Sequence, residues 1–217
     1  MQLNVPYVKQ PAGSVLCGPA CATMVLRFFG RKKSFNKVTE EIQVKSKAGI
    51  TVGHLASYFL SQGMDTTIQA WPLGMSEKYY TEEPIRGEIA VETLKRGAKG
   101  DAKGKARGFC RETVTAAKRG VSLILRPIIL SDLRRQLVKA PVIVSLDQKY
   151  FVELSRKTGH YAAAYGITPP DSQVTQPYLY VHDPDLAAEA FLPVKDILNA
   201  CNSWFGSVIY ATPKAER

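Results

Sequence analysis

The order in which apolar patterns follow one another predicts that this chain of 217 residues folds as a single α+β domain. The first third carries apolar residues at helical spacing, whereas short apolar runs bounded by Pro, Gly and Asp follow after residue 140. Helices first and strands later favour this class over an alternating fold with a parallel sheet. With 45% hydrophobic and 22% charged residues, the composition is that of one globular domain with a sizeable core.

Two clear helices are expected in the first third of the chain. The first begins at Cys17 and ends at Gly30, and its apolar residues recur every three to four positions. The second follows Thr51, whose hydroxyl can cap it, and is closed by Gly63. Two further helical candidates are residues 35–45 and residues 132–139, the latter with Ser131 as a possible N-cap.

Four short apolar runs after residue 140 predict the strands of an antiparallel sheet. They are residues 141–147, 161–167, 178–182 and 206–211.

The middle of the chain, at about 71–126, is predicted to be a basic, partly mobile insertion. Lys95–Gly108 contains four glycines and no large apolar residue, so it cannot bury enough surface to offset the entropy of ordering it. Residues 95–126 carry a net charge of +8 out of the +10 of the whole chain. Any acidic partner is therefore expected to meet this segment. Specific nucleic-acid binding is not expected, because residues 95–107 offer no aromatic ring on which a base could stack.

Other classes of protein are excluded by what the sequence lacks. No run of about 18 uncharged apolar residues occurs, and the first residues have neither a basic nor an apolar signal region. A membrane span is therefore not expected, while localisation stays open between the cytoplasm and, if a signal was removed, export. The four cysteines lack the paired spacing of a zinc site, and no metal or organic cofactor is expected.

Cys17 is the candidate nucleophile among the cysteines. It lies at the N-terminus of a predicted helix, where unpaired backbone N–H groups and the helix dipole favour a thiolate. Cys21 lies one turn further along the apolar stripe and is expected to be a buried structural residue, as are Cys110 and Cys201.

His160 is the candidate base, at the opening of a predicted strand. It follows Cys17 by 143 residues and precedes Asp183 by 23, an order and spacing typical of papain-like enzymes. His182 competes for this role, but neighbours on a strand point to opposite faces, so His182 and Asp183 should not serve one site. The same argument disfavours a metal site there, and His54 is expected to be an ordinary helix residue.

Gln10 precedes Cys17 by seven residues. Its side-chain amide could donate to a developing oxyanion together with the backbone N–H of Cys17, if the two lie close in space.

Four blocks of the sequence together resemble the double-glycine leader peptidase-like family, the bacteriocin-processing branch of the papain-fold cysteine peptidases. The blocks are Val5–Gln10, Cys17–Met24, Gly159–Tyr161 and Val181–Pro184. The resemblance covers about residues 2–70 and 130–210, and it is that of a stand-alone, prokaryotic member with no transporter segment.

The resemblance implies a papain-like fold, with the nucleophile helix packed on a C-terminal antiparallel sheet. It also implies that Cys17 is the nucleophile, His160 the base, Asp183 the group that orients it, and Gln10 the oxyanion donor. The expected reaction is cleavage of a peptide or amide bond in a peptide or protein substrate through a thioester, and the basic segment would suit an acidic substrate. Two alternatives remain: acyl transfer to an amine, and a catalytically silent module that binds an acidic partner.

Overall fold

The computed structural model describes residues 2–44, 49–71, 84–96, 99, 105–146, 159–186, 189–202 and 206–215. Within these residues, no helix is long and apolar enough to cross a membrane.

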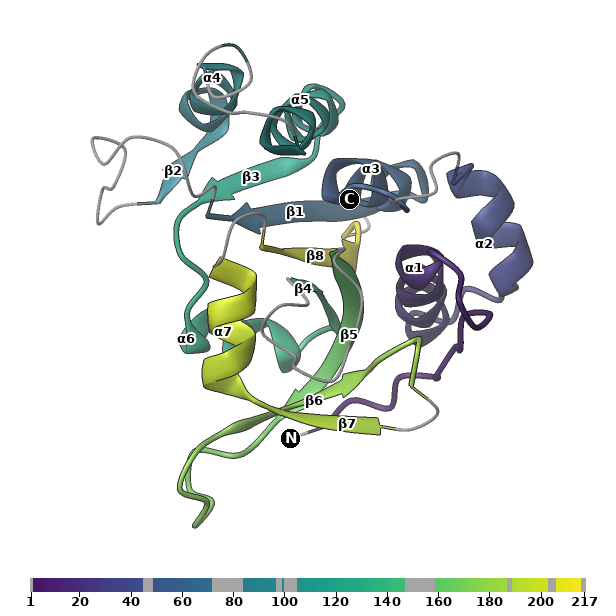
Figure 1. Ribbon diagram of the computed structural model, residues 1–217, viewed down its shortest axis with the longest axis vertical. Helices are drawn as coiled ribbons and strands as arrows, with labels where there is room; N and C mark the ends of the chain where they lie inside the picture. The colour runs from purple at the N-terminus through teal and green to yellow at the C-terminus, as the bar shows by residue number, and fades with distance from the viewer. Residues whose placement is uncertain are drawn as a thin grey trace.

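The central element of the described structure is one mixed sheet (Figure 1). Its strands lie in the order β2-β3-β1-β8-β4-β5-β6-β7. Neighbouring strands pair antiparallel except β1 and β3, which run parallel. The strands are β1 (Met64–Ala70), β2 (Ile85–Arg86), β3 (Ser122–Leu125), β4 (Val142–Leu146), β5 (His160–Ile167), β6 (Tyr178–His182), β7 (Glu189–Pro193) and β8 (Ser207–Pro213).

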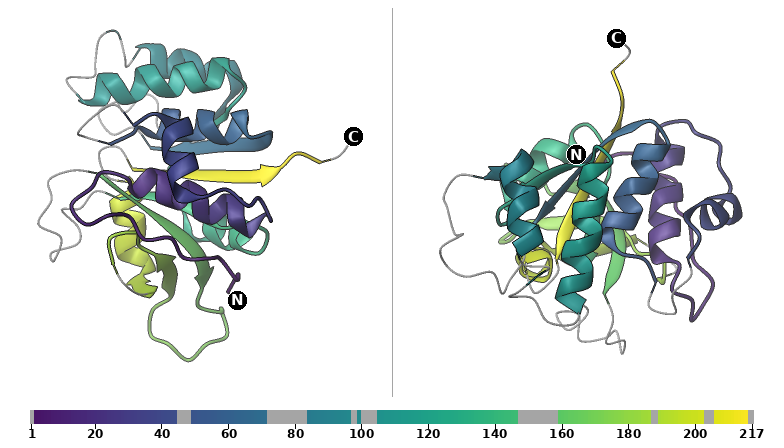
Figure 2. Two further views of the ribbon diagram at one scale, coloured as in Figure 1. Left: turned by 90° about the vertical axis from the view of Figure 1, so that its right-hand side faces the viewer. Right: turned by 90° about the horizontal axis from the view of Figure 1, so that it is seen from above.

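Helices cover both faces of the sheet (Figures 1 and 2). The helices α1, α3, α4 and α5 share one core with the sheet, and α2 packs on α1 and α3. The helices α6 and α7 share a second core with its other face. The helices are α1 (Cys17–Phe28), α2 (Phe35–Ile42), α3 (Val52–Ser61), α4 (Gly87–Arg96), α5 (Lys105–Lys118), α6 (Leu130–Leu137) and α7 (Val194–Asn202).

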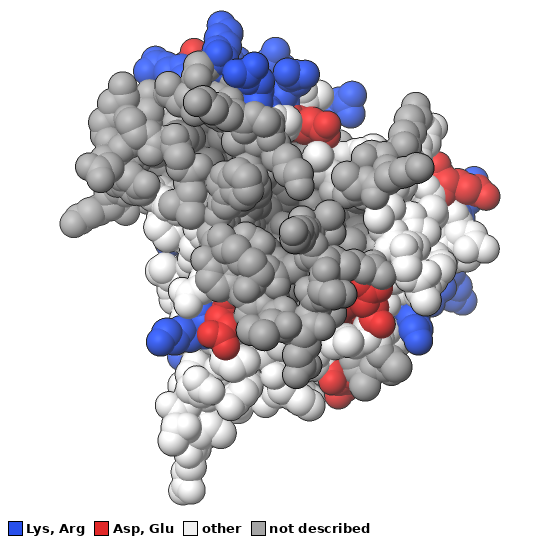
Figure 3. All heavy atoms as spheres, viewed as in Figure 1, with Lys and Arg blue, Asp and Glu red and all other residues white. Residues whose placement is uncertain are grey.

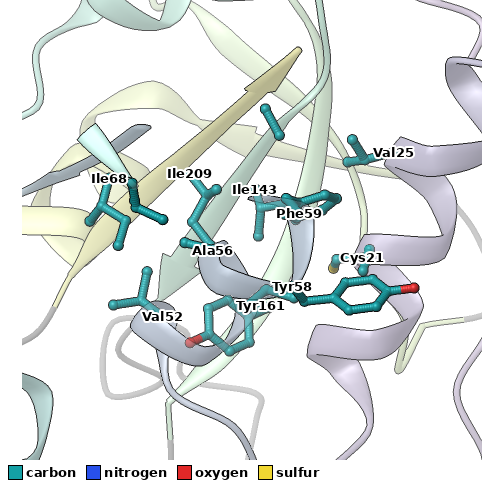
Figure 4. Packing of buried hydrophobic residues seen from close by; sticks show 14 of the residues in the cluster. Cys21, Val25, Val52, Ala56, Tyr58, Phe59, Ile68, Ile143, Tyr161 and Ile209 are labelled. Carbon is teal, nitrogen blue, oxygen red and sulfur yellow. The ribbon is translucent and has the colours of Figure 1, made fainter. Parts of the chain in front are cut away.

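The central strands divide their side chains between the two cores, as the twofold period of a strand requires. In β5, Tyr161 and Ala163 belong to the core under α1 and α3, whereas Ala162 and Ala164 belong to the core under α6 and α7. All eight residues of β5 are buried. In the first core, residues of α1 and α3 face isoleucines of β1, β4 and β8 (Figure 4). The expected packing of the Cys17 helix on the later strands is confirmed, because α1 packs on β5.

Most of the expected helix ends are confirmed. The hydroxyl of Thr51 accepts from the backbone N–H of His54 and caps α3. Gly30 and Gly63 follow α1 and α3 with φ of 75° and 70°, the left-handed conformation that glycine adopts without strain. The proposed cap Ser131 is wrong: the N-cap of α6 is Ile129, and its backbone N–H donates instead to the carboxylate of Asp132.

The sheet is wider than the sequence indicated, and it is not wholly antiparallel. The strand β1 belongs to the part of the chain expected to be mostly helical; its polar residues Asp65, Thr66 and Thr67 conceal the strand pattern. The chain leaves β1, passes through β2, α4 and α5, and returns in β3 beside β1. A connection through helices that rejoins the sheet next to its starting strand permits parallel pairing.

The expectation of a mobile loop over Lys95–Gly108 fails at both ends of that segment. Lys95 and Arg96 lie in the last turn of α4, and residues 105–108 form the first turn of α5. Both helices are anchored by apolar residues outside the glycine-rich stretch, such as Leu94 and Phe109. Residues 97, 98 and 100–104 lie outside the described part of the chain.

Gly53 allows α5 to pack closely on α3. A Cβ atom at this position would lie 2.6 Å from the carbonyl carbon and oxygen of Glu112 in α5. The hydroxyl of Thr51 also donates to the Glu112 carboxylate at 2.6 Å. The basic middle of the chain is thereby attached to the helical layer that contains α1.

We expect Gly53→Ala to lower the free energy of unfolding by about 1–3 kcal/mol, because the added methyl group must push α5 away from α3. Gly108→Ala is the matched control: Gly108 also lies in a helix, but a Cβ atom there would have nothing within 4 Å of it. That variant should be neutral or gain up to about 1 kcal/mol from helix propensity. Urea unfolding of both variants measures the difference, and equal stability of the two would contradict close packing at Gly53.

Candidate active site

Cys17 is the first residue of α1, and it is partly exposed. The N-cap residue Leu16 contributes no side-chain cap to the helix. The first N–H groups of an α-helix have no acceptor within the helix, so they can stabilise negative charge at this end. Cys21, one turn later, is fully buried, and burial raises its pKa well above the usual value.

His160 and Asp183 form a buried pair. Nε2 of His160 lies 2.7 Å from Oδ1 of Asp183, and the two residues are 3% and 5% exposed. His160 opens β5, and Asp183 directly follows β6. The strands β5 and β6 pair antiparallel, and their register, with Ala163 opposite His182, brings the two side chains to the same end of the strands.

Cys17 lies close enough to His160 to influence the pKa of its imidazole. Because Nε2 faces Asp183, Nδ1 is the ring nitrogen left for the cysteine. Burial alone would lower the pKa of His160, but hydrogen bonds to Asp183 and Cys17 and the negative charges of both outweigh it and raise this pKa to about 10. The arrangement therefore favours an imidazolium beside the sulfur.

Gln10 lies beside the segment that carries Asp183. Its backbone N–H donates to the carbonyl oxygen of Pro184 at 3.0 Å. Its Nε2 donates to Oδ1 of Asp185 and, at 3.3 Å, to the carbonyl oxygen of Ser14. The structure thus brings Gln10 together with the His160–Asp183 pair, and all three side chains are almost completely buried.

His182 points away from this cluster. Its Nε2 lies 2.8 Å from the carbonyl oxygen of Val5, and its ring stacks on Tyr165 with 4.3 Å between centroids. The structure therefore places His182 and Asp183 in different surroundings. His54 is an exposed residue of α3.

Ile50 and Tyr161 lie against the start of α1. The hydroxyl of Tyr161 donates to the carbonyl oxygen of Ile50 at 3.3 Å. A Cβ on residue 18 would lie 2.6 Å from Cδ1 of Ile50 and 3.5 Å from the Tyr161 ring, so Gly18 permits this close approach. Burial, and after it the charge of Cys17, raises the pKa of Tyr161, so its hydroxyl stays protonated.

The remaining cysteines lie in the cores. Cys110 belongs to the core under α1 and α3, and Cys201 to the core under α6 and α7. Burial raises the pKa of Cys110, and it raises that of Cys201 to about 12, so both stay thiols. Among the described residues, no group of three or more His, Cys, Asp or Glu could hold a metal ion.

Two residues that support this cluster were given no such role from the sequence, where Asp185 was considered only in the disfavoured metal site. The carboxylate of Asp185 accepts from Gln10, and its backbone N–H donates to Oδ1 of Asp183 at 2.8 Å. The hydroxyl of Tyr7 donates to the carbonyl oxygens of Asp183 and Leu186. The only signal in the sequence is position: Asp185 lies two residues after Asp183, and Tyr7 three before Gln10.

Residues 2–95 match the model of the Peptidase_C39 like family. Over these residues, the chain is similar to the C39 peptidase-like family. The resemblance stated from the sequence is thereby confirmed, and this similarity supports a cysteine peptidase function. The matched range contains Gln10 and Cys17 but not His160 or Asp183, whose placement comes from the fold.

Comparison with solved structures provides evidence on the fold. A double glycine motif protease from an AMS/PCAT transporter, in complex with its leader peptide, is 14% identical with a TM-score of 0.51; the alignment covers 98% of this chain and 94% of that one. The peptidase domain of Streptococcus ComA, a bifunctional ABC transporter, is 17% identical with a TM-score of 0.48, and the alignment covers 95% and 97% of the two chains. No curated protein matches the chain. The first likeness bears out the papain-like α+β fold for this C39-like chain.

We expect the imidazole of His160 in the C39-like chain to stay protonated at pH 8, since its pKa is raised above the ordinary 6.5. In Asp183→Ala the pKa of His160 should fall, because that substitution removes both a hydrogen bond to the cation and a negative charge. Nitrogen-15 NMR of the imidazole across a pH series measures this. Loss of the proton near pH 6.5 in the unaltered chain would contradict the expectation.

Proposed function

We propose that the chain is a cysteine peptidase that cleaves a peptide or amide bond, with Cys17 as nucleophile and His160 as base. One observation carries this proposal: Nε2 of the buried His160 lies 2.7 Å from Oδ1 of Asp183, and Cys17 lies close enough to raise the pKa of this imidazole. A nucleophile, a base and a group that orients the base are the three parts that nucleophilic catalysis requires.

In the resting state, His160 holds the proton of Cys17, which gives a thiolate beside an imidazolium. Asp183 accepts from Nε2–H, which fixes the ring and leaves Nδ1–H directed at the sulfur. The thiolate attacks the carbonyl carbon of the scissile bond, and its electron pair forms the carbon–sulfur bond while the carbonyl oxygen becomes an oxyanion. When the tetrahedral intermediate collapses, the carbon–nitrogen bond breaks, and Nδ1 gives its proton to the leaving amine.

Water resolves the thioester that remains. Neutral His160 takes a proton from water as the oxygen attacks the thioester carbon, and the carbon–sulfur bond then breaks to release the carboxylic acid and regenerate the thiolate. In both steps the oxyanion would be stabilised by the backbone N–H of Cys17 and by Nε2 of Gln10.

A peptide or protein substrate is supported by the family and by the likeness to a protease that is in complex with a leader peptide. Exposed Lys and Arg side chains of α4, α5 and their surroundings form a basic face, visible at the top of Figure 3. This basic face supports an acidic substrate. Its members are Arg96, Lys99, Arg107, Arg111, Lys118 and Arg119. The same face supports the second candidate function, a catalytically silent module that binds an acidic partner.

The first test separates these two functions by the reactivity of Cys17. With a limiting amount of iodoacetamide at pH 6, Cys17 should be labelled about tenfold or more faster than Cys21, Cys110 or Cys201, because only a thiolate reacts. His160→Ala should abolish this selectivity, and Asp183→Ala should weaken it less. Mass spectrometry of the digested protein measures labelling at each cysteine.

Cys17→Ala should abolish turnover and leave the unfolding transition unchanged, whereas Cys21→Ala should mainly cost stability, as a fully buried side chain does. Uniform, slow labelling of all four cysteines would support the silent module instead. Loss of labelling in His182→Ala but not in His160→Ala would reverse the choice of base.

The second test concerns the basic face. In the double variant Arg111→Gln/Arg119→Gln, KM for an acidic peptide substrate from a peptide library should rise about threefold at low salt, while kcat stays unchanged, because exposed charges steer association. The control Lys32→Gln/Lys139→Gln removes the same charge from exposed sites in other parts of the chain. An equal rise in the control, or no loss of the rise at high salt, would show that the basic face has no specific part in capture.

A further inference from the structure

Gln10 needs an external group to fix its orientation. It lies in the segment of residues 3–16, which forms neither helix nor strand. The backbone is tied at this point by the hydrogen bond from Gln10 N–H to the Pro184 carbonyl oxygen. That bond places the residue, but it does not determine whether the nitrogen or the oxygen of the side-chain amide faces the site. The two ends have opposite effects, since Nε2–H would stabilise an oxyanion and Oε1 would repel it.

The carboxylate of Asp185 supplies the missing constraint. A carboxylate at neutral pH only accepts hydrogen bonds, so the amide end that faces it must be the donor, Nε2. Reversal of the amide would bring Oε1 against Oδ1 of Asp185. In the observed orientation Oε1 is buried with no hydrogen-bond partner among the described residues, so it is the donor end that determines the orientation. An amide nitrogen has two hydrogens: one goes to Asp185, and the other makes only the long contact of 3.3 Å to Ser14.

We propose that Asp185 is the positioning residue of the oxyanion donor: its carboxylate holds the Gln10 amide with one N–H available to the substrate oxyanion. This inference rests on the proposed function of Gln10. In the Michaelis complex, the substrate oxygen replaces the long contact to Ser14 as the acceptor for the second hydrogen, while the bond to Asp185 persists.

The same residue is also tied to the base. The backbone N–H of Asp185 donates at 2.8 Å to Oδ1 of Asp183, the oxygen that lies 2.7 Å from His160. The side chain of Asp185 thus acts on Gln10 and its main chain acts on Asp183. A substitution to alanine removes the first link and keeps the second, so the two roles can be separated by experiment.

The first measurement needs no substrate. The side-chain amide protons of Gln10 are assigned by their loss in Gln10→Ala, with the full chain labelled with nitrogen-15. In the unaltered chain, one of these protons should be shifted downfield and protected from exchange by the charged acceptor. It should lose both properties in Asp185→Ala and keep most of them in Asp185→Asn, whose amide oxygen can still accept. Unchanged signals in Asp185→Ala would overturn the proposal.

The second measurement is a double-mutant cycle on turnover of a peptide substrate. Asp185→Ala should lower kcat about tenfold with little change in KM, because the amide is misplaced only for the transition state. The double variant Gln10→Ala/Asp185→Ala should be no slower than Gln10→Ala alone, because Asp185 acts through Gln10. Additive losses, or a rise in KM alone, would show a structural or binding role instead and would overturn the proposal. Asp185→Asn should keep at least about one third of kcat.

Selective alkylation of Cys17 distinguishes failure of this inference from failure of the proposed function. Alkylation depends on the Cys17–His160 pair and forms no oxyanion. Cys17 in the Asp185→Ala variant should therefore be alkylated at the same rate as in the unaltered chain. If the unaltered chain lacked a selectively reactive Cys17, the proposed function would fail, and the Gln10 signals would still decide whether Asp185 fixes the amide. If Cys17 is reactive and the Gln10 signals do not respond to Asp185, only the positioning role is wrong.

Discussion

The rest of the structure depends on the burial of β5 on both faces. Because all eight of its residues are buried, the helices must cover the sheet on both sides, and the alternate residues of this strand enter two separate cores. Tyr161 and Ala163 face the core that contains α1, which brings the start of that helix to the start of the strand. Cys17 and His160 are the first residues of these two elements. Their proximity therefore follows from packing that involves no catalytic atom.

The electrostatics of the site follow from that burial. A charged imidazole and a carboxylate in the interior are costly unless each is paired and hydrogen-bonded. Oδ1 of Asp183 has two donors, Nε2 of His160 and the backbone N–H of Asp185. Nε2 of His160 faces Asp183, and Cys17 raises the pKa of the same imidazole. Removal of any one member leaves a buried polar group without its partner, so the cluster is set as a unit and its members should not be assigned independent energies.

The sequence predicted the elements whose own residues carry the signal. The helix from Cys17 and the strands β4, β5, β6 and β8 have dense apolar patterns, and their positions are confirmed within a few residues. The elements from β1 to β3 were harder to recognise. Polar residues interrupt β1, and charged residues interrupt the apolar pattern of α4 and α5. These two helices pack on each other, on α3 and on the sheet. No local pattern could indicate that the chain would rejoin the sheet beside β1.

The residues of the candidate site also differ in how far the sequence could predict them. Cys17 and His160 belong to residue types whose chemistry is visible in the sequence, and Gln10 and Asp183 followed from their spacing and from the family blocks. Asp185 was considered only in the disfavoured metal site, and nothing in the sequence indicated a contact with Gln10. Its interest comes from a hydrogen bond across 175 positions of the chain, and such a link is visible only when the N-terminal segment has been placed against the end of β6.

A series of contacts joins the basic middle of the chain to the nucleophile helix. Glu112 of α5 accepts from Thr51 at the start of α3, and its backbone lies against Gly53. Ile50, next to Thr51, accepts from Tyr161 and lies against Gly18, which follows Cys17. Each step is a close packing contact or a hydrogen bond. A shift of α5 along α3 would therefore disturb the contact of Ile50 with the start of α1. The helix α5, which contributes most of the basic face, therefore has a fixed relation to the start of α1.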